Sequence, residues 1–117
     1  MRRILLTCLG GLMAGAAALV QAHAHLVSAT PADNSRLATA PERLVLSFSE
    51  AARLTALWIQ KQGGEKQKVS DLPADPARQV SVALPRLAPG AYTVSFRALS
   101  ADGHVVPGEI HFALVPP

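Results

Sequence analysis

Short runs in which apolar and polar residues alternate are the feature that most limits what this chain can fold into. In the run from Arg43 to Ser49, the large apolar residues Leu44, Leu46 and Phe48 all fall on one side. Alternation with a period of two residues is the pattern of a half-buried β-strand. Five further β-rich runs are separated by Pro, Gly, Asn and Asp, at His25–Ser28, Leu54–Gln60, Gln79–Leu84, Ala91–Leu99 and Glu109–Val115. Together with the lack of a convincing amphipathic helix, these runs predict an all-β Greek-key sandwich or barrel.

The few aromatic residues support a sandwich. Tyr92 follows the sequence Pro89–Gly90 at the start of a strand. This is the position of a tyrosine corner, in which the phenol hydroxyl pins a loop of a sandwich. We expect Trp58 and the three phenylalanines to lie in the core. Aromatic residues make up only 4% of the chain, so a stacking platform for bases or sugars is not expected.

The first stretch of the chain has the pattern of a secretory signal peptide. Arg2 and Arg3 precede a run from Ile4 to Val20 that contains no charge, and small residues follow it. An uncleaved membrane anchor is the alternative, but the run is short of the ~20 apolar residues that a spanning helix needs. We therefore expect residues 1–22 to be a signal peptide and residues 23–117 to form one exported domain, with cleavage after Ala24 as the second choice.

Removal of residues 1–22 changes the composition of the domain. Nine basic and eight acidic residues remain, with no basic run to follow a phosphate backbone, so nucleic acid is not an expected partner. The one cysteine and both methionines lie in the removed segment. The domain therefore lacks the thiolate and thioether ligands that select Cu(I).

Cleavage after Ala22 would make His23 the first residue. A terminal histidine can bind a metal through both its α-amine and its imidazole Nδ1, an arrangement called a histidine brace. The reference pKa values of these two groups, near 8 and 6.5, allow both to lose a proton to a metal at neutral pH. The alternative is that a histidine near a flexible chain end is incidental.

Asp102 and His104 form a second candidate site. They lie two residues apart, so extended backbone projects both to one side, and Gly103 between them permits a tight bend. With the brace they would complete a set of nitrogen and oxygen ligands, which favours Cu(II) or Ni(II). The alternative is a local turn in which Asp102 caps the backbone and His104 is solvated.

Three segments together resemble the CopC family of periplasmic copper-binding proteins. They are His23–Ala32, Leu46–Glu50 and the stretch from Tyr92 through Ser100–His104 to Gly108. The resemblance implies a seven-stranded, immunoglobulin-like Greek-key β-barrel. It also implies one Cu(II) ion held by His23, Asp102 and His104, with Glu50 nearby as a supporting or alternative ligand.

Some residues allow other interpretations within this resemblance. His25 would be the third residue after cleavage at Ala22, where it could compete for Cu(II), and it would itself be terminal after cleavage at Ala24. His111 is expected to face solvent from its strand. Relatives with a Cu(I) site build it from methionines, which the exported domain lacks, and they often carry Trp where this chain has Phe96.

The resulting hypothesis is a monomeric, non-enzymatic Cu(II) carrier or buffer in the periplasm, which either passes copper to a membrane partner such as a CopD-like copper transporter of the inner membrane or sequesters it. A histidine-brace copper monooxygenase acting on polysaccharide is the enzymatic alternative. A metal-free exported β-sandwich module is the structural alternative. The sequence contains none of the short motifs of common hydrolases or zinc proteases, and nothing in it brings Glu50 and Glu109 together as an acid and base pair.

Overall fold

The computed structural model describes residues 24–117, which form seven β-strands. Their bounds are β1 (Leu26–Thr30), β2 (Ser35–Leu37), β3 (Arg43–Lys61), β4 (Lys66–Lys68), β5 (Ala77–Ala83), β6 (Gly90–Ser100) and β7 (Val105–Leu114). Within this part of the chain there is no helix of the length and hydropathy needed to cross a membrane. The all-β architecture predicted from alternation is confirmed.

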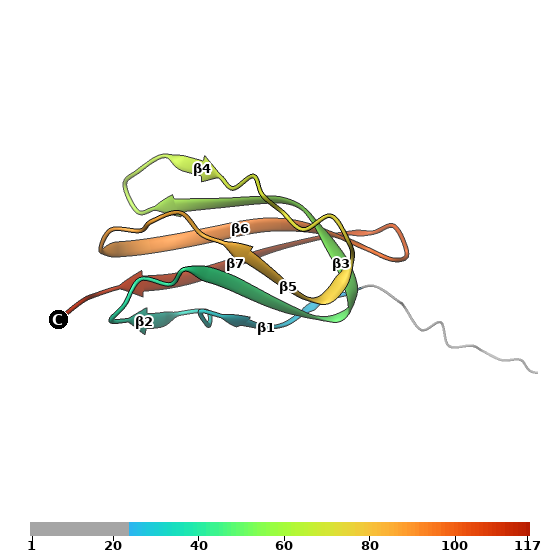
Figure 1. Ribbon diagram of the computed structural model, residues 1–117, viewed down its shortest axis with the longest axis horizontal. Coiled ribbons are helices and arrows are strands. Elements are labelled where there is room, and N and C mark those ends of the chain that lie inside the picture. The colour runs from blue at the N-terminus through green and yellow to red at the C-terminus, as the bar shows by residue number, and fades with distance from the viewer. Residues whose placement is uncertain (1–23) are drawn as a thin grey trace, which may run out of the picture.

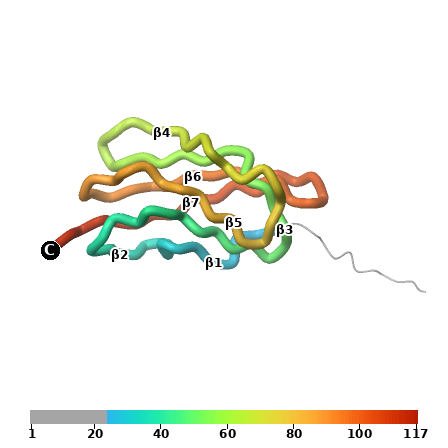
Figure 2. The backbone as a smooth tube through the Cα atoms, in the orientation of Figure 1, coloured from blue at the N-terminus to red at the C-terminus, as the bar shows by residue number. Residues whose placement is uncertain are grey.

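The long strand β3 belongs to both layers of the sandwich (Figure 1). Its first half pairs with β1 and β5, and its second half pairs with β4 and β6, all antiparallel. β7 lies antiparallel beside β6, and β2 pairs with β7 in parallel at the outer edge. Figure 2 shows the same path, with β5 crossing in front of β6 and β7. The fold is thus a seven-stranded sandwich made by one continuous, strongly bent sheet.

The core lies between the two layers and is built by the predicted alternation. Leu44, Leu46 and Phe48 of β3 are buried, as are Phe96 and Phe112. The rings of Phe48 and Phe96 meet edge to face with centroids 6.0 Å apart. Such aromatic contacts add about 1 kcal/mol to the free energy of burial.

The predicted tyrosine corner is confirmed. The Tyr92 hydroxyl donates a hydrogen bond to the Ala88 carbonyl oxygen at 2.6 Å, and the Tyr92 ring stacks on Phe112 with centroids 5.5 Å apart. One side chain therefore fastens the loop before β6 and packs in the core.

The prediction that Trp58 lies in the core is wrong. Pairing between β3 and β6 shifts register between Leu54 and Ala56, so Thr55 is an extra residue on β3, a β-bulge. One extra residue reverses the side to which all later side chains point. Leu57 therefore turns inward, and Trp58 lies partly exposed on the outer face.

Several strand boundaries also differ from the sequence prediction. The runs Arg43–Ser49 and Leu54–Gln60 are parts of one strand, because the backbone continues through the bend near Glu50 without a turn. β2 and β4 were not predicted, since three residues are too few to show a period. β7 begins at Val105, four residues before the predicted start at Glu109, because Pro107 and Gly108 are accommodated in the ladder.

Candidate metal centre

Three segments meet at one end of the sandwich. Ser49 donates a backbone hydrogen bond to the His25 carbonyl oxygen at 2.9 Å, which ties the start of the described chain to the bend in β3. On the other side of that bend, Ala52 pairs with Ser100 at the end of β6. Figure 1 shows this end at the right, where the described chain begins beside the β3 bend and the β6–β7 turn. Parts of all three segments that carry the CopC resemblance therefore meet at this end of the sandwich.

The β6–β7 turn holds Asp102 and His104. The turn is closed by backbone hydrogen bonds from Ser100 to the His104 carbonyl at 2.9 Å and from Gly103 to the Ser100 carbonyl at 3.0 Å. Gly103 has a φ of 88°, in the left-handed region that favours glycine. The bend expected between the two candidate ligands is thus present.

The Asp102 carboxylate is held in its ionised form. The buried hydroxyl of Ser100 donates a hydrogen bond to Asp102 Oδ1, which also accepts from the His104 backbone N–H at 3.2 Å. These bonds lower the pKa of Asp102 well below its ordinary value, with the Ser100 hydroxyl as the largest cause and the contacts from His104 next among those that lower it. A carboxylate that stays ionised across the physiological range is suited to a cation.

Asp102 and His104 are in direct contact. Asp102 Oδ2 lies 2.9 Å from His104 Nδ1. The His104 side chain is 65% exposed and the Asp102 side chain 23% exposed, so the carboxylate is sheltered while the imidazole reaches solvent. The structure shows the features of the local turn, because Asp102 caps the backbone and His104 is exposed, and it also brings the two side chains into contact.

The other predicted residues at this end are placed differently. Glu50 is exposed at the bend of β3, where its carboxylate lies 3.9 Å from the Arg78 guanidinium. His25 is exposed just before β1, and its Nδ1 and backbone N each lie 3.0 Å from Ser49 Oγ. Among residues 24–117, no hydrogen bond or ion pair joins Glu50 or His25 to the Asp102–His104 pair. Their role as supporting or alternative ligands therefore stays a prediction.

Within the described residues, no three metal-ligating side chains are gathered in a geometry that would hold an ion. The predicted terminal ligand, His23, lies outside the described residues, as do the predicted signal peptide and its cleavage site. The described part of the site is thus the Asp102–His104 pair, and further ligands would have to come from elsewhere. Ser100 lies in the stretch that resembles CopC, but no role in the site was predicted for it.

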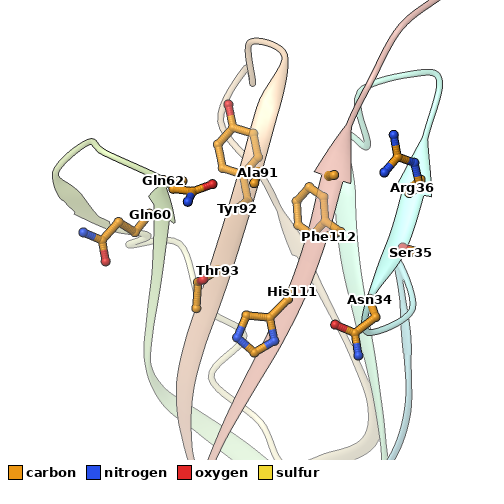
Figure 3. Close-up of a pocket in the computed structure, with 11 residues that line it drawn as sticks. Asn34, Ser35, Arg36, Gln60, Gln62, Ala91, Tyr92, Thr93, His111 and Phe112 are labelled. Carbon is orange, nitrogen blue, oxygen red and sulfur yellow. The ribbon is translucent and has the colours of Figure 1, made fainter.

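A second carboxylate–histidine contact lies at the opposite part of the sheet. His111 is exposed, as predicted, with Nδ1 3.2 Å from Asp33 Oδ1 and Nε2 3.3 Å from Glu109 Oε1. The two carboxylates approach opposite sides of the ring, so one ion cannot use both with the imidazole. His111 also lines an open cavity of about 540 Å³ between β3, β6, β7 and β2, whose other lining groups include Gln60, Thr93 and Asn34 (Figure 3). This cavity contains one histidine and no carboxylate, so it lacks the ligand set of a metal site.

A match to a family model shows to which protein family this chain belongs. The model of the CopC domain matches residues 26–115, which include all seven strands and nearly the whole described structure. The chain belongs to the CopC family. The resemblance inferred from the three sequence segments is confirmed.

CopC-family proteins of known sequence and structure match most of the chain. Protein YobA of Escherichia coli K12 is 34% identical over 100 residues, covering 81% of each chain. Copper resistance protein C of E. coli is 32% identical and covers 90% of this chain and 91% of its own. The crystal structure of CopC from Methylosinus trichosporium OB3b superimposes with a TM-score of 0.69 and 32% identity, over 80% of this chain and 95% of that one.

One CopC-family match is much longer than this chain. The copper transport protein CutJ of Bacillus subtilis is 30% identical over 80% of this chain, but that region is only 18% of CutJ. In CutJ, a region similar to this chain is thus a small part of a larger protein.

Proposed function

We propose that this CopC-family protein binds one Cu(II) ion at the end of the sandwich and carries or buffers copper in the periplasm. Relatives named for copper resistance and copper transport support copper as the cargo. The single observation that carries the proposal is the contact between an ionised carboxylate, Asp102, and the imidazole of His104 on a closed turn. The role is that of a binding protein without catalytic activity.

The spacing of the two donor atoms supports a shared ion. Two ligands that bind a metal at about 2.0 Å and at right angles lie about 2.8 Å apart. The observed separation of 2.9 Å between Asp102 Oδ2 and His104 Nδ1 is close to this value. A single ion bound to both atoms would therefore keep them at about their present separation.

His23 is proposed to supply the remaining ligands. It is bonded to Ala24, which is 1% exposed and packs in the core at the start of the described chain. After cleavage at Ala22, its α-amine and imidazole would join Asp102 and His104 in a nitrogen and oxygen set without sulfur, which favours Cu(II) over Cu(I).

Delivery to a membrane transporter is proposed as the fate of the copper. The match to a small part of CutJ supports this, because it places a region similar to this chain within a copper transport protein. A CopD-like transporter of the inner membrane is the proposed recipient, and the monomer is the proposed carrier.

The test is native mass spectrometry of the exported protein. The full precursor is expressed in a bacterial host, purified from the periplasm and measured before and after one equivalent of Cu(II). We expect a chain beginning at His23 that holds one copper ion, and an electron paramagnetic resonance spectrum of nitrogen and oxygen ligands. Asp102→Ala and His104→Ala should each lose the tightly held ion.

The matched controls are Asp33→Ala and His111→Ala, because these residues form the same type of contact on the same domain. They should bind copper like the wild-type chain. Copper binding that survives both Asp102→Ala and His104→Ala, or a correctly cleaved chain that ignores copper, would contradict the proposal. A chain that retains residues 1–22 would contradict the predicted cleavage and the terminal ligand.

A further inference from the structure

The outer face of β4, β3 and β6 carries a cluster of positive charge around the only tryptophan of the chain. Antiparallel pairing places directly opposed residues on the same side of a sheet. Trp58 pairs with Lys68, and Ala56 pairs with Arg97, so these side chains share the outer face with Trp58. We call this the basic face, and it consists of Arg53, Trp58, Lys66, Lys68 and Arg97.

The bulge at Thr55 creates the basic face. It turns Trp58 outward and leaves Arg53, before the bulge, on the same outer side opposite Leu99. The Thr55 hydroxyl donates to the Arg97 carbonyl oxygen at 3.3 Å, across the irregular part of the ladder. If inward and outward side chains alternated without interruption from Leu54, Trp58 would point into the core.

The basic face holds more cations than carboxylates. Residues 24–117 contain nine Lys and Arg against eight Asp and Glu, so the described domain is nearly neutral. The face nevertheless gathers four of these cations, and the carboxylate on the neighbouring part of β7 is Glu109 alone. Within residues 24–117, none of the four cations forms an ion pair with a carboxylate. Such a patch attracts an anionic partner and raises its association rate.

Trp58 adds an apolar anchor to this charge. The Lys66 ammonium lies 5.1 Å and the Arg97 guanidinium carbon 5.6 Å from the ring centroid, within the range of cation–π contacts. Beside the ring is an open depression of about 570 Å³, which Ser95, Pro107 and the single carboxylate of Glu109 also line. Tryptophan and arginine are the residues most enriched at the energetic centres of protein interfaces.

We propose that the basic face binds an acidic segment of another protein, with carboxylates on the four cations and an apolar side chain against Trp58. Charge complementarity identifies the partner as acidic. The position of Trp58 favours a protein over a lipid surface, because its ring lies beneath Lys66 and Arg97 rather than projecting alone toward the hydrocarbon of a membrane. This inference does not depend on copper binding, since the face shares no residue with the proposed metal centre.

The test uses the metal-free exported protein and a fluorescein-labelled peptide in which Glu and Thr alternate around a central Leu. We expect binding that weakens steeply with added salt, and a change in the emission and acrylamide quenching of Trp58, the only tryptophan. The double variant Lys68→Glu with Arg97→Glu should bind the peptide about tenfold more weakly, since two attractions become repulsions. The same peptide with Lys in place of Glu should not bind.

The matched control is Arg43→Glu with Arg86→Glu, which makes the same change in net charge away from the basic face. It should bind within about twofold of the wild-type chain, and thermal unfolding will show whether both double variants remain folded. Equal weakening by the two double variants, no binding of the acidic peptide, or binding that leaves Trp58 unchanged would overturn the proposal. So would binding to phosphatidylglycerol vesicles in preference to the peptide, which would assign the face to a membrane surface.

Discussion

Gly108 lies directly beneath the ring of Phe96, and we predict that Gly108→Ala destabilises the domain by packing alone. The two residues are opposed in the β6–β7 ladder and both face the core. A Cβ atom built on Gly108 would lie 2.3 Å from Phe96 Cζ and 2.6 Å from Phe96 Cε2. Ordinary carbon–carbon contacts are 3.5–4.0 Å, so the ring would have to move by more than about 1 Å.

The magnitude follows from the lack of space for that movement. Phe96 is 2% exposed, and its ring already meets Phe48 edge to face. Overpacking a filled core costs about 1–3 kcal/mol, and this contact is short enough for the upper end. Alanine also restricts the backbone of the unfolded chain, which offsets about 0.5–1 kcal/mol of this cost. A net loss of about 2 kcal/mol should lower the melting temperature of a domain of this size by about 10 °C.

Urea and thermal unfolding, followed by far-ultraviolet circular dichroism, would measure this loss. The double variant Phe96→Leu with Gly108→Ala provides the decisive comparison, because the smaller side chain makes room for the added methyl group. Its free energy of unfolding should fall by at least about 1 kcal/mol less than the sum of the two single changes.

Gly103→Ala is the matched control for the packing argument. At Gly103 an added Cβ meets nothing within 4 Å, but the φ of 88° is unfavourable for alanine. Gly103→Ala should therefore cost about 1 kcal/mol, and Phe96→Leu should not reduce that cost. A Gly108→Ala protein as stable as the wild-type chain, or a double variant whose losses simply add, would refute the packing argument.

Two further predictions concern the hydrogen bonds of Tyr92 and Asp33. Tyr92→Phe removes the hydroxyl that donates to Ala88 and should cost about 1 kcal/mol in urea unfolding, with no change in copper binding; an unchanged midpoint would show that the corner is held by packing. The backbone N–H of His111 is the main cause of a lowered pKa at Asp33. A lowered folded-state pKa gives stability that is present above the ordinary value of 3.8 and is lost as pH falls through the folded value. In copper-free protein, Asp33→Asn should therefore show a smaller loss of stability in acid than the wild-type chain, and identical pH profiles would contradict this reading.

The parts of the fold that alternate regularly could be predicted from the sequence. Leu44, Leu46 and Phe48 are buried on one side of β3, as their spacing indicates, and Tyr92 occupies its corner. The bulge at Thr55 could not be predicted, because nothing in its neighbours marks an extra residue in the ladder. That one residue decides the side of the sheet on which Trp58 lies.

Only part of the candidate metal centre could be predicted from the sequence. The spacing of Asp102 and His104 predicted that the two side chains project to one side, and the structure shows them in contact. Ser100 escaped notice because its importance comes from burial of its hydroxyl, which the sequence alone does not show. The roles of Asp102, His104, His23, His25 and Glu50 as copper ligands all remain predictions for the copper experiment.

The passage of β3 through both layers has a consequence for how the domain opens. β1, β4 and β5 form their ladders with this strand, and β6 pairs with it on one side, so neither layer can separate while the other stays intact. Local opening is therefore confined to the short edge strands and the turns, and loss of β3 is loss of the whole domain. The slowest amide hydrogens of the two layers should accordingly exchange at one common rate, that of global unfolding.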